Sequence, residues 1–443
     1  MSWTITGKPG AGDNLLYSQA GTPSLDLRFA STKSLTDFVS NGNLVTFTRA
    51  SSGTYVGSDG LIKTATTNEP RFDHNPTTGE SLGLLVEEPR TNSLLRSEEF
   101  DNASWINQNS TETIDASIST PTGGSNAYRL IDNSSNATHN IYQTTTVAGG
   151  TTTTLSVYAR QATLRYFRLG VTVSGTDYAV ADFDLQTGTV TQTGNGATGT
   201  VSNATAQSAG NGWIRCSAVF NTSGANRTAG LHTLNSGTMP ISGFGVSPYI
   251  GAGGYVHIWG PQLEAGAFPT SYIPTTTAAV TRSADVASIT GTNFSSWYGQ
   301  NEGTLLVNAT DGIAFPSTLR HYADLNNNSL TNSIGIVQSN IIYAGIGQNI
   351  VAGIYSGTLQ AAIDLGTQTV GGLRSAIAYR SNDISASRNG VIGTPDTFAT
   401  LPTPDRLIVG NASGYGRAIN STISRLTYWP QRLSNSTLQT ITQ

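Results

Sequence analysis

Hydrophobic and polar residues alternate along this chain in short runs, and no long stretch repeats its apolar positions with a helical period. Successive side chains of a strand point to opposite faces of a sheet, so this alternation predicts β-strands. The clearest runs are LSVYAR at 155–160, YFRLGVTV at 166–173, YAVADFDL at 178–185, WIRCSAVF at 213–220 and YVHIWGPQLE at 255–264. Clusters of Gly, Asn, Ser and Thr bound each run, as turns do between antiparallel strands. The pattern predicts an all-β protein of tandem antiparallel β-sandwich (jelly-roll) domains with a small β-rich N-terminal module.

The chain is predicted to have four segments. They are residues 1–23, 24–97, 98–280 and 281–443. The first is polar and Gly-rich, and we interpret it as an N-terminal docking arm, with a folded-back terminus as the alternative. Pro274–Val280 is the clearest linker. Near the other end of the chain, Ser434 is expected to cap a short helical turn.

Composition narrows the classes of partner. Charged residues make up 11% of the chain, and the formal net charge is −4. The three lysines, Lys8, Lys33 and Lys63, are far apart and no basic run exists, so nucleic acid is not an expected partner. No apolar run approaches the ~20 residues that cross a bilayer, so membrane insertion is not expected. The N-terminus lacks the pattern of a signal peptide, which predicts synthesis in a cytoplasm.

Residues 47–95 carry the most specific pattern in the sequence. They read FTRASSGTYVGSDGLIKTATTNEPRFDHNPTTGESLGLLVEEPRTNSLL. This stretch resembles a module of bacteriophage virion proteins, found in tail fibres and head spikes, in which FTR, TYV, PRFD, GLLVE and RTN recur in this order. The match spans both charged and apolar positions.

The two later segments resemble modules that follow it in such fibres. Phe183–Val190, Asn211–Arg215 and Gln262–Thr275 resemble pieces of a carbohydrate-binding-module-like jelly roll. The turn Ser387–Gly390 and the closing run ISRLTYWPQRLS resemble the concanavalin/laminin-G-like β-sandwich.

These resemblances imply a structural virion protein of a tailed bacteriophage, a tail fibre or head spike that attaches to a host-surface glycan. They imply a location on the particle surface, contact with other virion proteins through the N-terminal arm, and a homo-oligomer, commonly a trimer in such fibres. Two alternatives stay open. One is a non-binding collar, cement or decoration protein of the particle, and the other is a polysaccharide depolymerase on the same scaffold.

Carboxylates are scarce where a glycosidase would need them. Such enzymes use two carboxylates about 5–10 Å apart, and the E-x-D-x-E pattern of concanavalin-like hydrolases is absent. Only Glu264 and Glu302 follow Glu112. Asp182 and Asp184 share one face of a predicted strand, and we interpret them as exposed carboxylates at a strand-end turn. The expectation is that the chain is not an enzyme.

The sequence also contains no residue pattern typical of a metal or cofactor site. The five histidines show no metal-ligand spacing. The single cysteine, Cys216, is expected to be a buried small apolar residue. The oxygen-rich run Ala323–Ser329 contains one carboxylate, Asp324, and predicts an Asn-rich turn rather than a calcium loop. No metal and no cofactor are expected.

Two sets of side chains remain as candidates for a role. Sugar rings stack on aromatic side chains, so the carbohydrate-binding candidates are Trp297 and Tyr298, together with Tyr322 and Tyr415, which lie in sequence that we interpret as Asn- and Gly-rich loops. Within the phage-like module, Arg49, Arg71 and Arg90 are predicted to be structural arginines. Their guanidinium groups would tie loops to carboxylates such as those of Asp73, Glu87 and Glu88.

Overall fold

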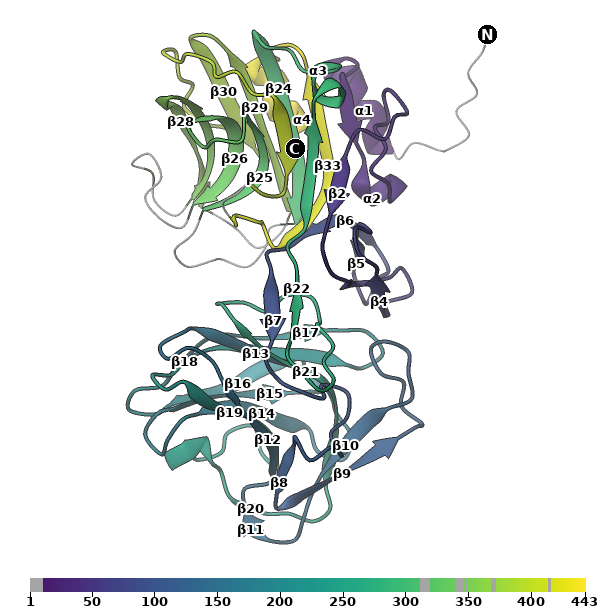
Figure 1. Ribbon diagram of the computed structural model, residues 1–443, viewed down its shortest axis with the longest axis vertical. Coiled ribbons are helices and arrows are strands. Elements are labelled where there is room, and N and C mark those ends of the chain that lie inside the picture. The colour runs from purple at the N-terminus through teal and green to yellow at the C-terminus, as the bar shows by residue number, and fades with distance from the viewer. Residues whose placement is uncertain (1–10, 311–318, 340–345, 347–348, 368–371, 413–415) are drawn as a thin grey trace.

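A computed structural model describes residues 11–310, 319–339, 346, 349–367, 372–412 and 416–443. It contains two β-rich lobes arranged end to end along the long axis of the molecule (Figure 1). The described parts of both chain ends belong to the upper lobe, and the middle of the chain forms the lower one. Strands provide nearly all the regular structure, which confirms the predicted all-β class.

The lower lobe is a sandwich of two six-stranded antiparallel sheets. The first has the order β17 (Thr200–Ser208), β18 (Ile214–Asn221), β13 (Thr153–Arg160), β21 (Tyr255–Ala265), β10 (Ala127–Asp132) and β9 (Ser110–Asp115). The second has the order β16 (Thr189–Asn195), β15 (Tyr178–Asp184), β14 (Tyr166–Thr172), β19 (Asn226–Leu234), β12 (Asn140–Thr146) and β8 (Ile106–Gln108). All five runs of alternating residues singled out in the sequence become strands. Their apolar sides, including Phe167, Leu169 and Val171, meet in the core between the sheets.

The upper lobe is a second sandwich. Its eight-stranded sheet has the order β31 (Val391–Ile392), β30 (Asp383–Arg388), β29 (Gly372–Arg380), β24 (Glu302–Thr310), β33 (Ser421–Trp429), β6 (Ser81–Val86) and β5 (Phe72–His74), with β1 (Leu25–Leu27) also paired to β33. The facing sheet has the order β2 (Thr46–Thr48), β23 (Val286–Thr290), β32 (Arg406–Val409), β25 (Leu319–Asn326), β26 (Asn332–Ser339), β27 (Asn349–Ser356) and β28 (Thr358–Thr367).

Strands from both ends of the sequence share these sheets. Leu25 pairs with Tyr428, Val86 with Ser421, and Phe47 with Ala287. The N-terminal strands have three to six residues and bury their side chains in one core with the C-terminal strands. Such short strands need a larger sheet to bury an apolar face. Segment 24–97 therefore completes the C-terminal sandwich. The predicted segment boundaries themselves stay predictions.

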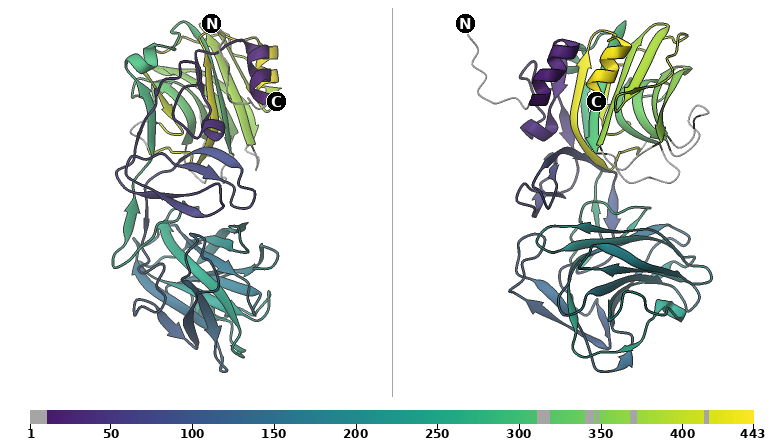
Figure 2. Two further views of the ribbon diagram at one scale, coloured as in Figure 1. Left: turned by 90° about the vertical axis from the view of Figure 1, so that its right-hand side faces the viewer. Right: turned by 180° about the vertical axis from the view of Figure 1, so that it is seen from behind.

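The two lobes are connected by a pair of short antiparallel strands. The chain leaves the upper lobe through β7 (Arg90–Asn92) and returns through β22 (Val280–Arg282), with Arg90 opposite Arg282. The predicted linker Pro274–Val280 leads into this returning strand. The lower lobe is thus an insertion between two halves of the upper sandwich. A hairpin of β3 (Gly53–Val56) and β4 (Ile62–Ala65) lies beside the junction (Figure 2).

Helices are few and short. Helix α1 (Ala11–Ala20) lies beside α4 (Asn435–Ile441) on the eight-stranded sheet (Figure 2), where Leu16 and Ala20 contact Trp429 and Leu438. The described part of segment 1–23 is therefore a helix folded back on its own chain, because it carries apolar residues that fit this surface. Residues 1–10 lie outside the described residues. Ser434 accepts a hydrogen bond from the Thr437 main-chain N–H at 3.1 Å, which confirms the predicted cap.

The remaining elements are a 3-10 turn, two four-residue helices and a two-stranded ribbon. They are η1 (Gly243–Gly245), α2 (Phe29–Thr32), α3 (Thr292–Ser295), β11 (Asn136–Ala137) and β20 (Tyr249–Ile250). Among the described residues, no helix has the length and apolar character needed to span a membrane.

Candidate functional site: a groove on the jelly roll

The aromatic residues selected from the sequence lie inside the upper sandwich rather than on its surface. Tyr322 is 1% exposed on β25, because the segment read as a loop is a strand that turns this ring into the core. Trp297 is 4% exposed and packs edge-on against Phe294 and Tyr428. The half-buried ring of Tyr298 stacks on Phe294. Tyr415 lies outside the described residues. Neither Tyr322 nor Trp297 presents a ring face on which a sugar could stack.

The three selected arginines lie near the junction of the lobes. Arg49 donates to Asp285 Oδ1 at 3.1 Å, and Arg71 contacts both Asp285 Oδ2 and Glu87, the latter at 2.8 Å. Arg90 pairs with Glu88 at 2.6 Å. All three arginines are buried, and Asp285 is fully buried. Asp285 is more than 200 residues away in the sequence, so sequence spacing gave no sign that it would be their shared partner.

Charge compensation at the junction is strong. Burial opposes ionisation of Glu87, yet the neighbouring Arg282 and Arg71 outweigh it and lower the pKa of Glu87 to about 2. Asp73, expected as an arginine partner, instead accepts a hydrogen bond from the Val56 main-chain N–H at 2.6 Å. Burial raises the pKa of Asp73 to about 6.

A groove of about 330 Å³ lies on the outer face of the lower lobe's second sheet. Its volume falls in the ~300–1,000 Å³ range of small-molecule sites. Along β14, the side chains of Phe167, Leu169 and Val171 face the core, so Gly170 and Thr172 face the groove. Strand pairing places Tyr142, Gly230 and Gly170 in one row across β12, β19 and β14. The two adjacent glycines in neighbouring strands contribute no side chains of their own to this row.

The floor glycines make room for His232. A Cβ atom at Gly230 would lie 2.6 Å from His232 Nε2, and one at Gly170 would lie 3.4 Å from it. The imidazole therefore extends over the glycine row. Burial, with a smaller contribution from Arg168, lowers the pKa of His232 to about 3, so the ring is neutral near pH 7. A neutral imidazole both donates and accepts hydrogen bonds.

Aromatic rings form the walls of the groove. Tyr142 is half-buried on one side, and Phe244 is 58% exposed in the loop that contains η1. The backbone of Phe244 adopts a φ of 66°, a left-handed conformation that bulky residues rarely take. Hydrogen bonds hold this loop, because Thr172 Oγ1 donates to the Phe244 carbonyl at 3.1 Å and Arg168 donates to the Gly245 carbonyl at 2.8 Å. Such observed strain favours a functional role for the residue.

An ion pair on the same face of the sheet as the groove supports that loop. Arg168 contacts Asp182 through two hydrogen bonds of 2.6 and 2.8 Å and also donates to Ser247 Oγ at 2.7 Å. Burial raises the pKa of Asp182, and Arg168 opposes that rise. Asp184 pairs with Arg165 at 2.7 Å. The interpretation of Asp182 and Asp184 as exposed turn carboxylates was therefore wrong, because both are buried and held by arginines.

Two polar atoms in the groove lining have no hydrogen-bond partner among the described residues. They are Asn140 Oδ1 and His232 Nδ1. Each residue is 6% exposed. A buried polar group without a partner costs about 1–3 kcal/mol, so such atoms mark places where a ligand can compensate. The sequence held one sign of this site, since an isolated glycine inside a strand pattern, such as Gly170 in YFRLGVTV, marks a close approach.

Comparisons with known proteins found similarity to solved structures alone. No protein-family model matches this sequence, and no curated protein sequence matches it either. The carbohydrate-binding module (CBM40) of a Ruminococcus gnavus sialidase, bound to α2,3-sialyllactose, is similar at 11% identity and a TM-score of 0.27. That similarity covers 32% of this chain and 83% of the module.

Trypanosoma rangeli sialidase in complex with the inhibitor DANA is similar over more of the chain. The identity is 10% and the TM-score 0.29, and the similarity covers 71% of this chain and 60% of the sialidase. The prediction that this chain is not an enzyme is corrected by this finding. It rested on the absence of one carboxylate motif of one fold, and that absence excludes only one catalytic arrangement. The similarity assigns no activity to this chain.

Proposed function

We propose that this protein binds a glycan in the groove of its lower lobe. The observation that carries the proposal is the two-glycine floor between Tyr142 and Phe244, the latter held in a left-handed conformation by its loop. Sugar rings present C–H faces that stack on aromatic rings. The groove of about 330 Å³ above His232 has room for one such ring, and it opens to the surface at Phe244.

The polar lining suits the hydroxyl groups of a sugar. Asn140, His232, Thr172 and Thr228 line the groove, and none of them is charged near pH 7. A sugar hydroxyl can donate to the Asn140 carbonyl oxygen after a rotation of the amide, which would provide the partner that this buried atom lacks. A few fixed polar groups among apolar walls are typical of ligand sites. The proposed ligand is a neutral sugar unit of a larger glycan.

A glycan microarray carrying bacterial surface polysaccharides tests this proposal. The wild-type protein should bind a subset of the spots, and Phe244→Ala should weaken that binding about tenfold, as loss of an aromatic stacking partner does. Phe398 is a matched control, since it is 87% exposed and lies in the upper lobe. Phe398→Ala should bind as the wild type does. Equal losses in the two variants, or no binding to any spot by the wild type, would contradict the proposal.

We also propose that the protein is carried on a tailed-phage particle as a tail fibre or head spike. The phage-like pattern at 47–95 supports this placement. The competing proposal is a collar or decoration protein without a ligand. Antibody labelling of particles viewed by electron microscopy separates the two, because a fibre projects from the particle and a decoration protein follows its shell.

A further inference from the structure

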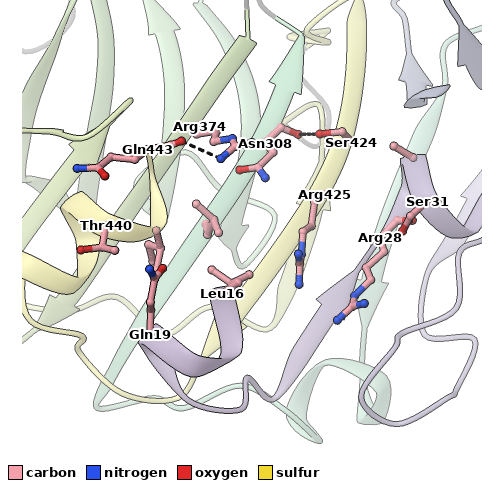
Figure 3. A pocket seen from close by; sticks show the side chains of 13 residues that line it. Leu16, Gln19, Arg28, Ser31, Asn308, Arg374, Ser424, Arg425, Thr440 and Gln443 are labelled. Atoms are coloured by element: carbon pink, nitrogen blue, oxygen red, sulfur yellow. Dashed lines mark hydrogen bonds between the residues drawn. The ribbon is translucent and has the colours of Figure 1, made fainter. Parts of the chain in front are cut away.

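The upper lobe contains a pocket of about 370 Å³ between α1, α4 and the eight-stranded sheet, and three arginines line it (Figure 3). The protein itself supplies partners for their guanidinium groups. Arg374 Nη1 donates to the Gln443 main-chain oxygen at 2.8 Å. Arg28 and Arg425 donate to Asp26 at 2.6 and 2.8 Å. The arginines of this pocket therefore do not indicate an anionic ligand.

Another pocket, of about 250 Å³, lies at the junction of the two lobes, and we call it the junction pocket. The upper lobe lines it with the hairpin β3–β4, which lies beside the junction in Figure 2, with β5 and β6, and with the start of β33. The lower lobe lines it with residues of β13, β17 and β18 and with the loop 269–272. The pocket reaches the surface at the exposed side chain of Gln207.

A buried tyrosine brings an unpaired hydroxyl group to this pocket. Tyr158 is 6% exposed, and its ring packs against Trp259 with the ring centroids 5.4 Å apart. Burial raises the pKa of Tyr158, so the phenol is protonated near pH 7. None of the described residues forms a hydrogen bond with this hydroxyl. A buried polar group without a partner is unfavourable, and a ligand in the pocket can provide that partner.

Two charged side chains face the junction pocket from different lobes. Asp73, in the upper lobe, accepts a hydrogen bond from the Val56 main-chain N–H at 2.6 Å and forms no ion pair with a described residue. Arg215, in the lower lobe, donates through Nη2 to the Thr270 carbonyl at 2.6 Å and to Ser156 Oγ at 3.2 Å. Its buried Nε has no hydrogen-bond partner among the described residues. The pocket thus contains a carboxylate that can accept and a guanidinium that can donate.

Register shifts in both lobes lie at these side chains. The β5–β6 ladder shifts between Asp73 and His74, and the β13–β21 ladder shifts between Ser156 and Tyr158. Such shifts are typical of β-bulges, which re-aim side chains and are frequent beside active sites. At the second shift Gly260 has a φ of 61°, and a Cβ there would lie 3.3 Å from Tyr158 Cδ2. Each lobe therefore places a polar side chain of this pocket at an irregular position of a sheet.

We propose that the junction pocket binds one neutral sugar unit through its hydroxyl groups. The Asp73 carboxylate requires donors, Arg215 Nε requires an acceptor, and the Tyr158 hydroxyl can act as either. A sugar hydroxyl both donates and accepts, so one ring can satisfy all three groups. A simple cation would leave Arg215 Nε unpaired, and a simple anion would be repelled by Asp73. The volume of about 250 Å³ is just below the ~300–1,000 Å³ of drug-sized sites and suits one small ring.

Saturation-transfer NMR on the full chain tests this proposal with three free sugars, D-glucose, D-galactose and D-mannose. The titrations use the Phe244→Ala variant, in which the separate groove is already impaired. At least one sugar should give a saturable signal, and an equal concentration of tetramethylammonium or acetate should not reduce it. Absence of binding by all three sugars, or equal displacement by either ion, would overturn the proposal.

Two further substitutions and one control, made in the same variant, locate the bound sugar. Tyr158→Phe removes only the unpaired hydroxyl, so it should weaken sugar binding about tenfold without lowering the melting temperature. Asp73→Asn keeps the size of the side chain, removes its charge and should weaken binding by a similar factor. Tyr255 is half-buried on β21 and does not line the pocket, so Tyr255→Phe should bind unchanged. Unchanged binding in Tyr158→Phe and Asp73→Asn, or equal losses in all three variants, would contradict a sugar site at the junction.

Discussion

The junction between the lobes and the groove on the lower lobe both contain arginines buried against carboxylates, but these ion pairs hold different things in place. At the junction, Asp285 joins Arg49 and Arg71, which lie more than 200 residues away in the sequence. Beside the groove, Arg168 and Asp182 are only 14 residues apart, and Arg168 also donates a hydrogen bond to Gly245 in the loop that carries Phe244. The junction ion pairs hold the two halves of the upper sandwich together around the inserted lower lobe. The Arg168–Asp182 pair positions the loop that carries Phe244, one wall of the groove.

This difference indicates where a substitution should change stability and where it should change binding. Buried ion pairs contribute little net stability compared with apolar residues, but removing one partner leaves an uncompensated charge. None of the residues in the junction ion pairs lines the proposed glycan groove, so substituting one of them should lower stability and leave glycan binding unchanged. Substituting Arg168 or Asp182 should affect both stability and glycan binding, and the two effects should be separable.

The largest expected effect follows from Asp285→Ala. It leaves Arg49 and Arg71 buried without their shared carboxylate, and the free energy of unfolding should fall by about 3–5 kcal/mol. Denaturant unfolding at neutral pH measures this loss. Asp405 is the control, because it pairs with Arg406 on the surface and Asp405→Ala should cost at most about 1 kcal/mol. Equal losses of unfolding free energy in the two variants would contradict a structural role for the junction ion pairs.

Arg168→Met should destabilise by a similar amount, since Asp182 is then buried without its partner. Adding Asp182→Leu removes the remaining charge and should recover most of that stability. The double variant still lacks the hydrogen bonds from Arg168 to Gly245 and Ser247. Glycan binding should therefore stay lost while folding returns. Recovery of binding together with stability would show that the ion pair does not position the Phe244 loop.

A smaller effect is expected from pH through Asp73. Its pKa is raised from 3.8 to about 6 by burial, so the folded state holds the proton more tightly than the unfolded chain does. Its contribution should destabilise the fold progressively as pH rises from about 4 to about 6, by at most about 3 kcal/mol. Asp73→Asn should thus raise the free energy of unfolding more at pH 8 than at pH 4. An equal change at both pH values would contradict the raised pKa.

The smallest expected change comes from a single methyl group on the groove floor. A Cβ at Gly170 would meet His232 Nε2 and Val180 Cγ1 at 3.4 Å, which is ordinary contact, so Gly170→Ala should fold normally. The methyl group would lie against the His232 imidazole and restrict how that ring adjusts to a ligand, so affinity for the selected glycan should fall by about tenfold, or about 1.4 kcal/mol. At Gly188, on the turn after β15, a Cβ would meet Ile214 Cδ1 at 3.5 Å, and the φ of 64° there favours glycine. Gly170 is thus the cleaner probe of the floor.

The strands could be predicted from the sequence because alternation is a local property. The runs at 155–160 and 166–173 became β13 and β14 for that reason. The groove could not be predicted, since the row of Tyr142, Gly230 and Gly170 depends on which distant strands pair and in which register. Tyr322 was misread because Asn-rich sequence follows it, although the residue itself lies within β25. The pairing of Asp285 with Arg49 and Arg71 could not be predicted either, because only the folded upper sandwich brings these distant residues together.

The central claim is that a glycan occupies the floor of the groove beside His232. The chain has five histidines, so selective isotope labelling of histidine gives a small set of NMR signals. The probe is the glycan that gives the strongest microarray signal, titrated at pH 7 where His232 is neutral. The account predicts that the His232 signals shift with ligand concentration, while those of His257, which contacts Asp115 on the opposite sheet, stay in place. Saturable binding of that glycan with no change at His232 would contradict the account.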